Sequence, residues 1–572
     1  MSADSHNLEG QLDQVASEAP QPFLTTGLPS IAQLAEAVRN PEAIAVPSQA
    51  QSSKRFPWWA PSMSDLFVLA FFTWTFFGGT LGWKRLLADA DSGWHIRTGE
   101  VILQTHAVPH KDLFSSVKPN DDWYAWEWLT DVTWAALHNT FGLRGICWFA
   151  GILIAAMVAL WLRFSLWMGA SLFISLGTVL LASGAASVHF LARPHAFTLA
   201  LLPLSVWMIE ADRRRPSNGV FLLIPLVALW ANLHGGFPAV LLVLGALSAG
   251  SAIEVLIGAA NASWARVKRY GLVTLGAAAA SLLNPYGYHL QKHMLDYLTS
   301  DFIRNFVQEF QSPSFRGETI LQFEILLFVG LVAAASLIQR KRVTEVLWIL
   351  GFAHMALTSI RHITVYAAVV APYIAVEITR WWNTAFAGAS RKSIAGIWNQ
   401  VTSDLTPSFA RTTFWLPLAL ASVVFIPTQI AQWPTDYPSE VFPVDLMHKR
   451  QDLLASTKLL TSDQWGDYLI YLNYPKQRVF VDGRSDFFGP EIGDQYVQLL
   501  QGQYQWRGLL EKYGFEHVLA PLDWPLTSLL KIDPGWKILD DTGKAVLFER
   551  VHPFGGQVQG NQGSTGLSSG GR

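Results

Sequence analysis

The sequence predicts a polytopic α-helical membrane protein with about eleven transmembrane helices and a small C-terminal α/β domain outside the membrane. Three observations predict this fold class. The 572 residues are 51% hydrophobic and only 15% charged, whereas soluble domains carry about 25% charged residues. Apolar runs long enough to cross a bilayer recur along the chain. After residue 431 these runs stop, and short segments typical of β-strands begin.

The two ends of the chain are predicted to be disordered. Residues 1–58 are rich in Ser, Ala, Gln and Pro and lack the apolar segment of a cleavable signal peptide, so we expect a cytoplasmic tail. Residues 553–572 are a second low-complexity tail. The single cysteine, Cys147, excludes an internal disulfide, and the net charge of −2 argues for no nucleic-acid partner.

Residues 59–431 are predicted to form the membrane domain. A helix needs about 20 mostly apolar residues to cross the hydrocarbon core of the bilayer. Runs of this kind lie near residues 63–83, 144–163, 169–189, 194–211, 219–234, 236–258, 269–285, 319–339, 343–360, 362–380 and 412–431. The stretch between the first and second runs, residues 84–143, is predicted to be a long outer loop.

Basic residues set the predicted orientation, because short loops rich in Lys and Arg stay on the cytoplasmic side. With a cytoplasmic N-terminus, eleven spans place every basic cluster on that side. The clusters are Lys54 with Arg55, Arg163, and the groups within 212–215, 266–269, 339–342 and 380–392. We therefore expect an integral protein of a bacterial inner membrane, with residues 84–143, 286–318 and the C-terminal domain on the extracytoplasmic side.

Polar side chains recur at the predicted outer ends of the helices. Arg193 and His195 occur in "LARPHAF", His234 in "WANLHGGF", and Arg361 with His362 in "TSIRHITV". A charge at bilayer depth costs at least about 2.5–3.5 kcal/mol. This repeated cost predicts one shared outward-facing cavity. The alternative is that each side chain reaches the headgroups separately.

The outer loop begins with two acids in "LLADADSGWHIRTGE", residues 86–100. In an extended segment, alternate side chains point the same way, so Asp89 and Asp91 can meet one divalent cation or one cationic partner. Oxygen ligands suit Mg²⁺ or Mn²⁺, and His95 is a further candidate ligand. A carboxylate here can also act as a general base. Glu127 follows in an aromatic-rich helix, and its direction relative to the acids stays open.

This order of elements resembles the GT-C superfamily: a first span, a D-x-D pair, an amphipathic outer loop, further spans and an outer C-terminal domain. These membrane glycosyltransferases use polyprenyl-linked sugar donors and include protein O-mannosyltransferases and oligosaccharyltransferase catalytic subunits. The resemblance implies a GT-C-like fold over residues 60–550. It also implies that Asp91, with Asp89, is catalytic or metal-binding, assisted by His95 or Glu127.

Residues 432–552 are predicted to form the extracytoplasmic α/β domain. The segments "RVFVDGR", "HVLAPLDW", "WKILDD" and "AVLFER" are predicted strands, and residues 490–513 are predicted to be helical. Within "SDQWGDYL", the order Trp465-Gly466-Asp467-Tyr468 is similar to the W-W-D-Y-G pattern of oligosaccharyltransferases, although the tandem Trp is absent. The similarity implies that Trp465 and Asp467 bind the acceptor; a helix start is the structural alternative.

A further acceptor-binding candidate is Arg484. It lies in the loop after the predicted strand 478–481, and such loops often carry function. Its guanidinium suits a phosphate or a sugar carboxylate, and a salt bridge within the turn is the structural alternative.

Together these features predict transfer of a sugar from a polyprenyl-phosphate-linked donor to an unidentified acceptor at the extracytoplasmic face. Guanidinium groups fit phosphate oxygens in pairs, so Arg193 and Arg361, with His195, His234 and His362, are predicted to bind the donor phosphate. The alternative is a transporter or flippase with an outer binding domain, because "NLHGGFP" at 232–238 breaks two helices with Gly and Pro.

Overall fold

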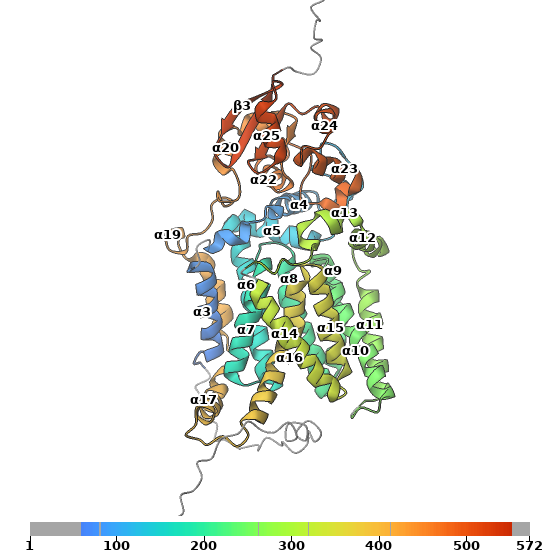
Figure 1. Ribbon diagram of the computed structural model, residues 1–572, viewed down its shortest axis with the longest axis vertical. Coiled ribbons are helices and arrows are strands. Elements are labelled where there is room, and N and C mark those ends of the chain that lie inside the picture. The colour runs from blue at the N-terminus through green and yellow to red at the C-terminus, as the bar shows by residue number, and fades with distance from the viewer. Residues whose placement is uncertain (1–58, 79–81, 261, 318–319, 412, 552–572) are drawn as a thin grey trace, which may run out of the picture.

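The computed structural model describes residues 59–551 except 79–81, 261, 318–319 and 412. The two predicted tails and the basic pair Lys54–Arg55 lie outside the described residues. Figure 1 shows three layers: a bundle of long helices, a layer of helices lying across one end of it, and a mixed domain above that layer. We call the covered end of the bundle the cap end.

A helix stands at each of the eleven predicted positions in the bundle. These are α3 (Met63–Phe77), α6 (Leu143–Met168), α7 (Leu172–Ala186), α8 (His195–Arg214), α9 (Leu223–Leu233), α10 (Pro238–Leu256), α11 (Trp264–Ala280), α14 (Ile320–Gln339), α15 (Val343–Thr358), α16 (His362–Ala385) and α18 (Trp415–Ser422). Among the described residues, five helices are long and apolar enough to cross a membrane: α6, α7 extended to His189, α10, α14 and α16. The structure is therefore that of a helical membrane protein, and the number of eleven crossings stays a prediction.

The basic clusters within the described residues lie at the end of the bundle opposite the cap, where α17 (Ile394–Phe409) also lies (Figure 1). Arg163 near the end of α6 pairs with Asp65 near the start of α3. Arg213 near the end of α8 lies 2.8 Å from both Glu210 and Glu345. The Arg163–Asp65 and Arg213–Glu345 pairs each link the ends of two helices, whereas the Arg213–Glu210 pair lies within α8.

The cap layer consists of η2 (Gly82–Leu87), α4 (Asp91–Thr105), α5 (Trp128–Phe141), α12 (Tyr288–Thr299), α13 (Asp301–Phe306) and η5 (Gln308–Phe310). Two glycines let α4 pack closely on both sides. A β-carbon at Gly99 would lie 1.9 Å from the carbonyl oxygen of Asp131 in α5. One at Gly93 would lie 2.8 Å from the carbonyl oxygen of Asp467 in α22 (Asp463–Asn473). Helix α4, which carries Asp91, is thus fixed between the membrane domain and the C-terminal domain.

The C-terminal domain surrounds a four-stranded sheet. Its elements are α20 (Val444–Lys449), α21 (Gln451–Ser456), β1 (Leu459–Leu460), α22, α23 (Ser485–Leu500), α24 (Trp506–Tyr513), β2 (His517–Pro521), α25 (Pro525–Ile532), β3 (Trp536–Asp541) and β4 (Ala545–Arg550). The strand order is β1-β2-β4-β3; β1 and β2 are parallel and the other pairs antiparallel. The last three predicted strands and the predicted helical segment are confirmed.

The predicted strand at 478–481 is wrong. This segment joins no strand of the sheet; instead, Val479 forms an isolated parallel bridge with Ser115, within the predicted outer loop 84–143. Its amide donates to the carbonyl oxygen of Phe114, and its carbonyl oxygen accepts from the amide of Ser116. Val479 is thus paired with the segment 84–143, whereas Phe480 packs against Tyr513 and Phe515 of the C-terminal domain. Residues 482–486, which follow, line the cap end of the bundle together with Asp91.

Candidate functional site

A cavity of about 290 Å³ lies at the cap end of the bundle, at the lower limit of typical small-molecule sites. Its walls come from α4, the starts of α8, α10 and α16, helix α12, and the segments around residues 309 and 483–486. Of the residues predicted from sequence, Asp91, Glu127, Arg193, His195, His234, Arg361, His362 and Arg484 line it. Asp89, His95, Trp465 and Asp467 lie behind this lining.

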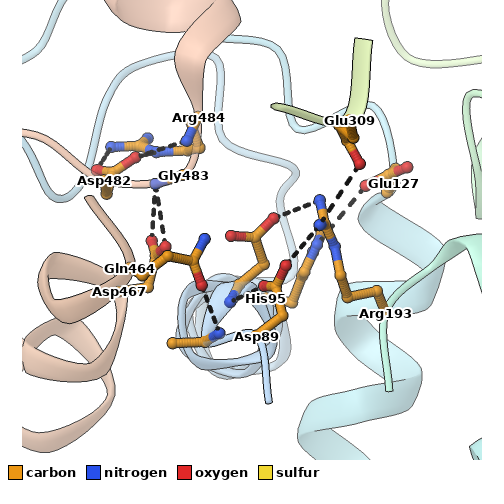
Figure 2. A network of polar contacts seen from close by, with 12 residues as sticks. Asp89, His95, Glu127, Arg193, Glu309, Gln464, Asp467, Asp482, Gly483 and Arg484 are labelled. Carbon is orange, nitrogen blue, oxygen red and sulfur yellow. Dashed lines mark hydrogen bonds and ion pairs between the residues drawn. The ribbon is translucent and has the colours of Figure 1, made fainter. Parts of the chain in front are cut away.

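Arg193, just before α8, joins the two acids of the D-x-D pair. Its Nη1 lies 2.8 Å from Oδ2 of Asp89, and its Nη2 contacts Oδ2 of Asp91. Figure 2 shows the guanidinium reaching between these acids and Glu309. The predicted extended geometry of the pair is wrong, because α4 begins at Asp91 and the Asp91 amide donates to Oδ1 of Asp89 at 2.9 Å. The carboxylates nevertheless meet at one cationic partner.

The opposite side of Asp91 faces Asp467 and Gly483. The Gly483 amide donates to both carboxylate oxygens of Asp467, at 3.0 and 3.1 Å (Figure 2). A β-carbon at Gly483 would lie 2.1 Å from Oδ1 of Asp91, so only glycine leaves room for this carboxylate. Asp467 and Gly483 of the C-terminal domain therefore meet Asp91, which is more than 370 positions away in the sequence.

The two carboxyls are close enough to share a proton. Burial raises the pKa of Asp91 well above its usual range, although the positive charge of Arg193 opposes the shift. Burial also raises the pKa of Asp467, and the neighbouring Asp91 carboxylate raises it further. Since Arg193 contacts only Asp91 of this pair, it favours an ionised Asp91 and leaves the shared proton on Asp467. A protonated Asp467 also supplies a donor to Oδ1 of Asp91, which is otherwise unpaired among the described residues.

Glu127, just before α5, points into the cavity and stands between two histidines. Its Oε1 is 3.5 Å from Nε2 of His234, and its Oε2 is 3.7 Å from Nε2 of His95. Burial raises the pKa of Glu127 to about 7, with Arg193 opposing the shift. His95 is held from behind, because its Nδ1 lies 2.6 Å from Oδ1 of the buried Asp131. The carboxyl of Glu127 can therefore exchange a proton near neutral pH.

The second guanidinium of the cavity belongs to Arg361, just before α16. Its Nη1 lies 3.5 Å from Oε1 of Glu309, whose Oε2 is 3.9 Å from Nη1 of Arg193. Burial would raise the pKa of Glu309, but the charges of Arg361 and Arg193 outweigh it and lower the pKa to about 2. Glu309 is therefore a carboxylate at every physiological pH.

Arg484 is held in a cage at the edge of the cavity. Its Nη2 donates to Asp482 at 2.7 Å and to Asp112 at 2.9 Å. The guanidinium carbon lies 4.7–4.9 Å from the ring centres of Phe114, Trp123 and Phe487. Nη1 of Arg484 has no hydrogen-bond partner among the described residues. Two carboxylates already balance this charge, so the free nitrogen suits a neutral oxygen acceptor better than a second anion.

Trp465 does not face the cavity. It is buried in the core of the C-terminal domain, and its amide donates to the Ser462 side chain that caps α22. Its neighbour Asp467 reaches the site only through Asp91 and Gly483. Within the W-G-D segment, Trp465 therefore serves packing, and Asp467 contacts the cavity lining.

The remaining walls of the cavity are apolar. Leu199 and Leu202 of α8, Leu242 of α10, and Val365 and Ala368 of α16 line the part that continues down the bundle. The polar groups lie above them, under the cap layer. One cavity thus combines charged groups with an apolar surface facing the bundle interior.

The three predicted metal ligands do not form a metal site. Both nitrogens of His95 face carboxylates of residues 127 and 131, and Arg193 already pairs with Asp89 and Asp91. In the part of the chain that the structure describes, no group of three or more His, Cys, Asp or Glu side chains is arranged to hold a metal ion. The donor set therefore does not fit Mg²⁺ or Mn²⁺.

Several residues at the site were not found from the sequence. Asp131 lies four residues after Glu127, a helical spacing that could have identified it. Glu309 lies between Gln308 and Phe310 in "NFVQEF", within the predicted outer loop 286–318, but nothing local indicates its partners. Asp112 pairs with Arg484 across 372 positions of sequence, and no local pattern indicates that contact.

No family model and no curated protein sequence matches the chain. Among solved structures, the chain is similar to the archaeal oligosaccharyltransferase AglB from Archaeoglobus fulgidus, determined in complex with an inhibitory peptide and a dolichol-phosphate. The TM-score is 0.55 at 10% sequence identity, over 84% of this chain and 73% of that chain. The likeness shows a shared fold.

Proposed function

We propose that the protein is a membrane glycosyltransferase that moves a sugar from a polyprenyl-phosphate-linked donor to an acceptor at the extracytoplasmic face. The cavity at the cap end carries this proposal, because two guanidiniums and several carboxyls stand directly above an apolar wall. A lipid-linked sugar phosphate has the same division into a charged headgroup and an apolar chain. The dolichol-phosphate named with AglB supports a donor of this class.

The donor phosphate is assigned to Arg193 and Arg361, with His195, His234 and His362 around it. The bond between the anomeric carbon and the phosphate oxygen breaks, and the oxygen keeps the electron pair. Guanidinium groups stabilise the charge that develops on this oxygen, which is usually the largest contribution to such catalysis. The apolar wall along α8, α10 and α16 would hold the first part of the lipid chain.

Asp91 is assigned as the general base. An atom of the acceptor forms the new bond to the anomeric carbon, and its proton passes to the ionised Asp91 carboxylate. Asp89 and Arg193 fix the position of this carboxylate. Glu127, with a pKa of about 7, is a second group able to take up the proton.

The acceptor is proposed to enter beneath residues 483–486. Arg484 would offer its free Nη1 to an oxygen of the acceptor. Asp467 would act through Asp91, and Trp465 would hold α22 in place. The chemical class of the acceptor stays open.

The rival function is a transporter or flippase. One observation favours it: Gly235, Gly236 and Pro238, at the break between α9 and α10, line the cavity. Broken helices at a binding site are common in transporters.

The test uses the full-length protein in lipid vesicles with polyprenyl-phosphate sugars labelled in the sugar. A transferase releases polyprenyl phosphate and passes the label to an acceptor present in a membrane extract. A transporter moves the intact donor across the bilayer and releases no polyprenyl phosphate. Intact donor after incubation with every sugar tested would refute the transferase proposal.

A further inference from the structure

Glu309 lies where the proposed function puts the donor phosphate. Its carboxylate stands between Arg193 and Arg361, which belong to the starts of two different helices (Figure 2 shows the Arg193 side). No other carboxylate of the described residues pairs with Arg361. The cavity therefore already contains an anion at the position between its two guanidiniums.

The ion pairs of the Glu309 carboxylate are longer than ordinary hydrogen bonds. The distances of 3.5 Å to Arg361 and 3.9 Å to Arg193 exceed the usual hydrogen-bond length of about 2.7–3.2 Å. Nη1 of Arg361 is buried and has no hydrogen-bond partner among the described residues. A planar carboxylate thus spans the two guanidiniums without saturating them. A phosphate carries more oxygens in a tetrahedral arrangement and can accept hydrogen bonds from both guanidiniums.

The backbone of Glu309 is fixed by hydrogen bonds, whereas its side chain is held only by ion pairs. The carbonyl oxygen of Glu309 accepts from the Arg361 amide at 3.2 Å and from the Ser359 hydroxyl at 2.9 Å. Phe310 is buried, and the Arg361 guanidinium lies 4.4 Å from the centre of its ring. The carboxylate can therefore rotate away without movement of the segment that carries it.

The charges around Glu309 favour replacement of its carboxylate by a phosphate over binding of a phosphate beside it. Arg193 is already paired with Asp89 and Asp91, whereas Arg361 is paired with Glu309. A phosphate added beside Glu309 would place two anions against the single guanidinium of Arg361, at considerable electrostatic cost in a buried site. A phosphate that replaces the carboxylate keeps the balance.

We propose that Glu309 is a positioning residue that occupies the donor-phosphate site in the empty protein, and that its carboxylate is displaced when a polyprenyl phosphate binds. This inference rests on the proposed function. The carboxylate keeps the two guanidiniums in place before the donor arrives and competes with the phosphate for them.

The test is binding of a polyprenyl phosphate without sugar to the full-length protein, wild type and Glu309→Gln. Competition predicts that removing the charge tightens binding by about threefold or more, whereas a purely structural role predicts weaker binding. Asp486→Asn is the matched control, because Asp486 also lines the cavity but pairs with His293. This control should change the dissociation constant less than Glu309→Gln does.

A second variant, Glu309→Asp, and a second ligand, the polyprenol without phosphate, separate competition for the phosphate from a structural role. Glu309→Asp retains the charge but shortens the reach of a carboxylate whose backbone is fixed, so it should also bind the phosphate more tightly than wild type. Binding of the matching polyprenol, which lacks the phosphate, should be the same in every variant. Unchanged or weaker phosphate binding in both variants overturns the inference. Absence of phosphate binding in the wild type would instead count against the proposed function.

Discussion

The two ends of the helical bundle use the same residue types for different purposes. At the end opposite the cap, Arg213 lies 2.8 Å from both Glu210 and Glu345, and Arg269 forms two hydrogen bonds with Asp212, so these groups pair with one another, whereas Oε2 of Glu345 has no hydrogen-bond partner among the described residues. At the cap end, guanidiniums and carboxyls face a cavity, and Nη1 of Arg484 has no hydrogen-bond partner among the described residues.

This difference separates a structural charge network from a candidate site. A buried ion pair that satisfies itself links helices and leaves no capacity for a ligand. A charged group that lacks a partner beside a cavity has that capacity. The charged groups of the cap end therefore differ from those of the opposite end mainly in that they line the cavity.

The largest expected effect is that of Asp91→Asn on transfer. Loss of a general base typically lowers the rate by about 10²–10⁴-fold. The variant should insert and fold normally, because the amide still fits beside Arg193 and Gly483. The exposed Asp445→Asn in the C-terminal domain is the control and should keep full activity. Full activity of Asp91→Asn would remove this residue from the mechanism.

Gly483→Ala tests the contact between the C-terminal domain and the cavity. The added methyl group would meet Oδ1 of Asp91 at 2.1 Å and push the carboxylate aside. A displacement of about 1 Å can cost about 10²-fold in rate. Gly508→Ala in α24 is the matched control, since a β-carbon there meets nothing within 4 Å. Equal turnover rates for the two alanine variants would contradict the account.

The pH dependence of transfer should reflect Glu127. Its carboxyl, with a pKa of about 7, must be ionised to accept a proton. The rate should therefore rise about tenfold per unit up to pH 7 and then level off. In Glu127→Gln this rise should disappear from the rate profile measured between pH 5.5 and 8.5. If the variant keeps the same pH profile, the rise in rate up to pH 7 belongs to a group other than Glu127.

Glu345→Gln tests the opposite end of the bundle. Removing one partner of a buried ion pair costs about 3–5 kcal/mol of stability. Thermal unfolding in detergent should shift to a lower temperature, whereas the turnover rate of the protein that remains folded should match wild type. A selective loss of turnover at unchanged stability would show that the two ends are not functionally distinct.

Removal of divalent metal should have the smallest effect. Arg193 already pairs with both acids of the D-x-D pair, so EDTA should leave transfer within about twofold of the untreated rate, and added Mg²⁺ or Mn²⁺ should not raise it further. Loss of activity in EDTA, restored by Mn²⁺, would show that Arg193 gives way to a metal ion.

The sequence predicted the parts of the structure that depend on local composition. Apolar runs marked each helix of the bundle, because burial in lipid demands a continuous apolar surface. Arg193, His234 and Arg361 could be brought together from sequence, since ends of antiparallel helices meet in one plane when their orientation is known.

Features that depend on tertiary contacts could not be predicted in this way. His95 faces Asp131 because of how α4 rotates against α5, and nothing in its own segment determines that rotation. Residues 478–481 have the composition of a strand, but their partner is the outer loop rather than the sheet. In the sequence, Glu309 does not differ from other acids in loops. Its position between Arg193 and Arg361 exists only in the folded structure.

The most direct test of the central claim is to map where the lipid headgroup binds. A polyprenyl phosphate with a photoreactive group close to the phosphate would be cross-linked to the purified protein, and the modified peptides identified by mass spectrometry. Labelling at the starts of α8 and α16 and around residues 309 and 483–486 is the predicted result. Labelling confined to the opposite end of the bundle, or to outward surfaces away from the cavity, would contradict the account.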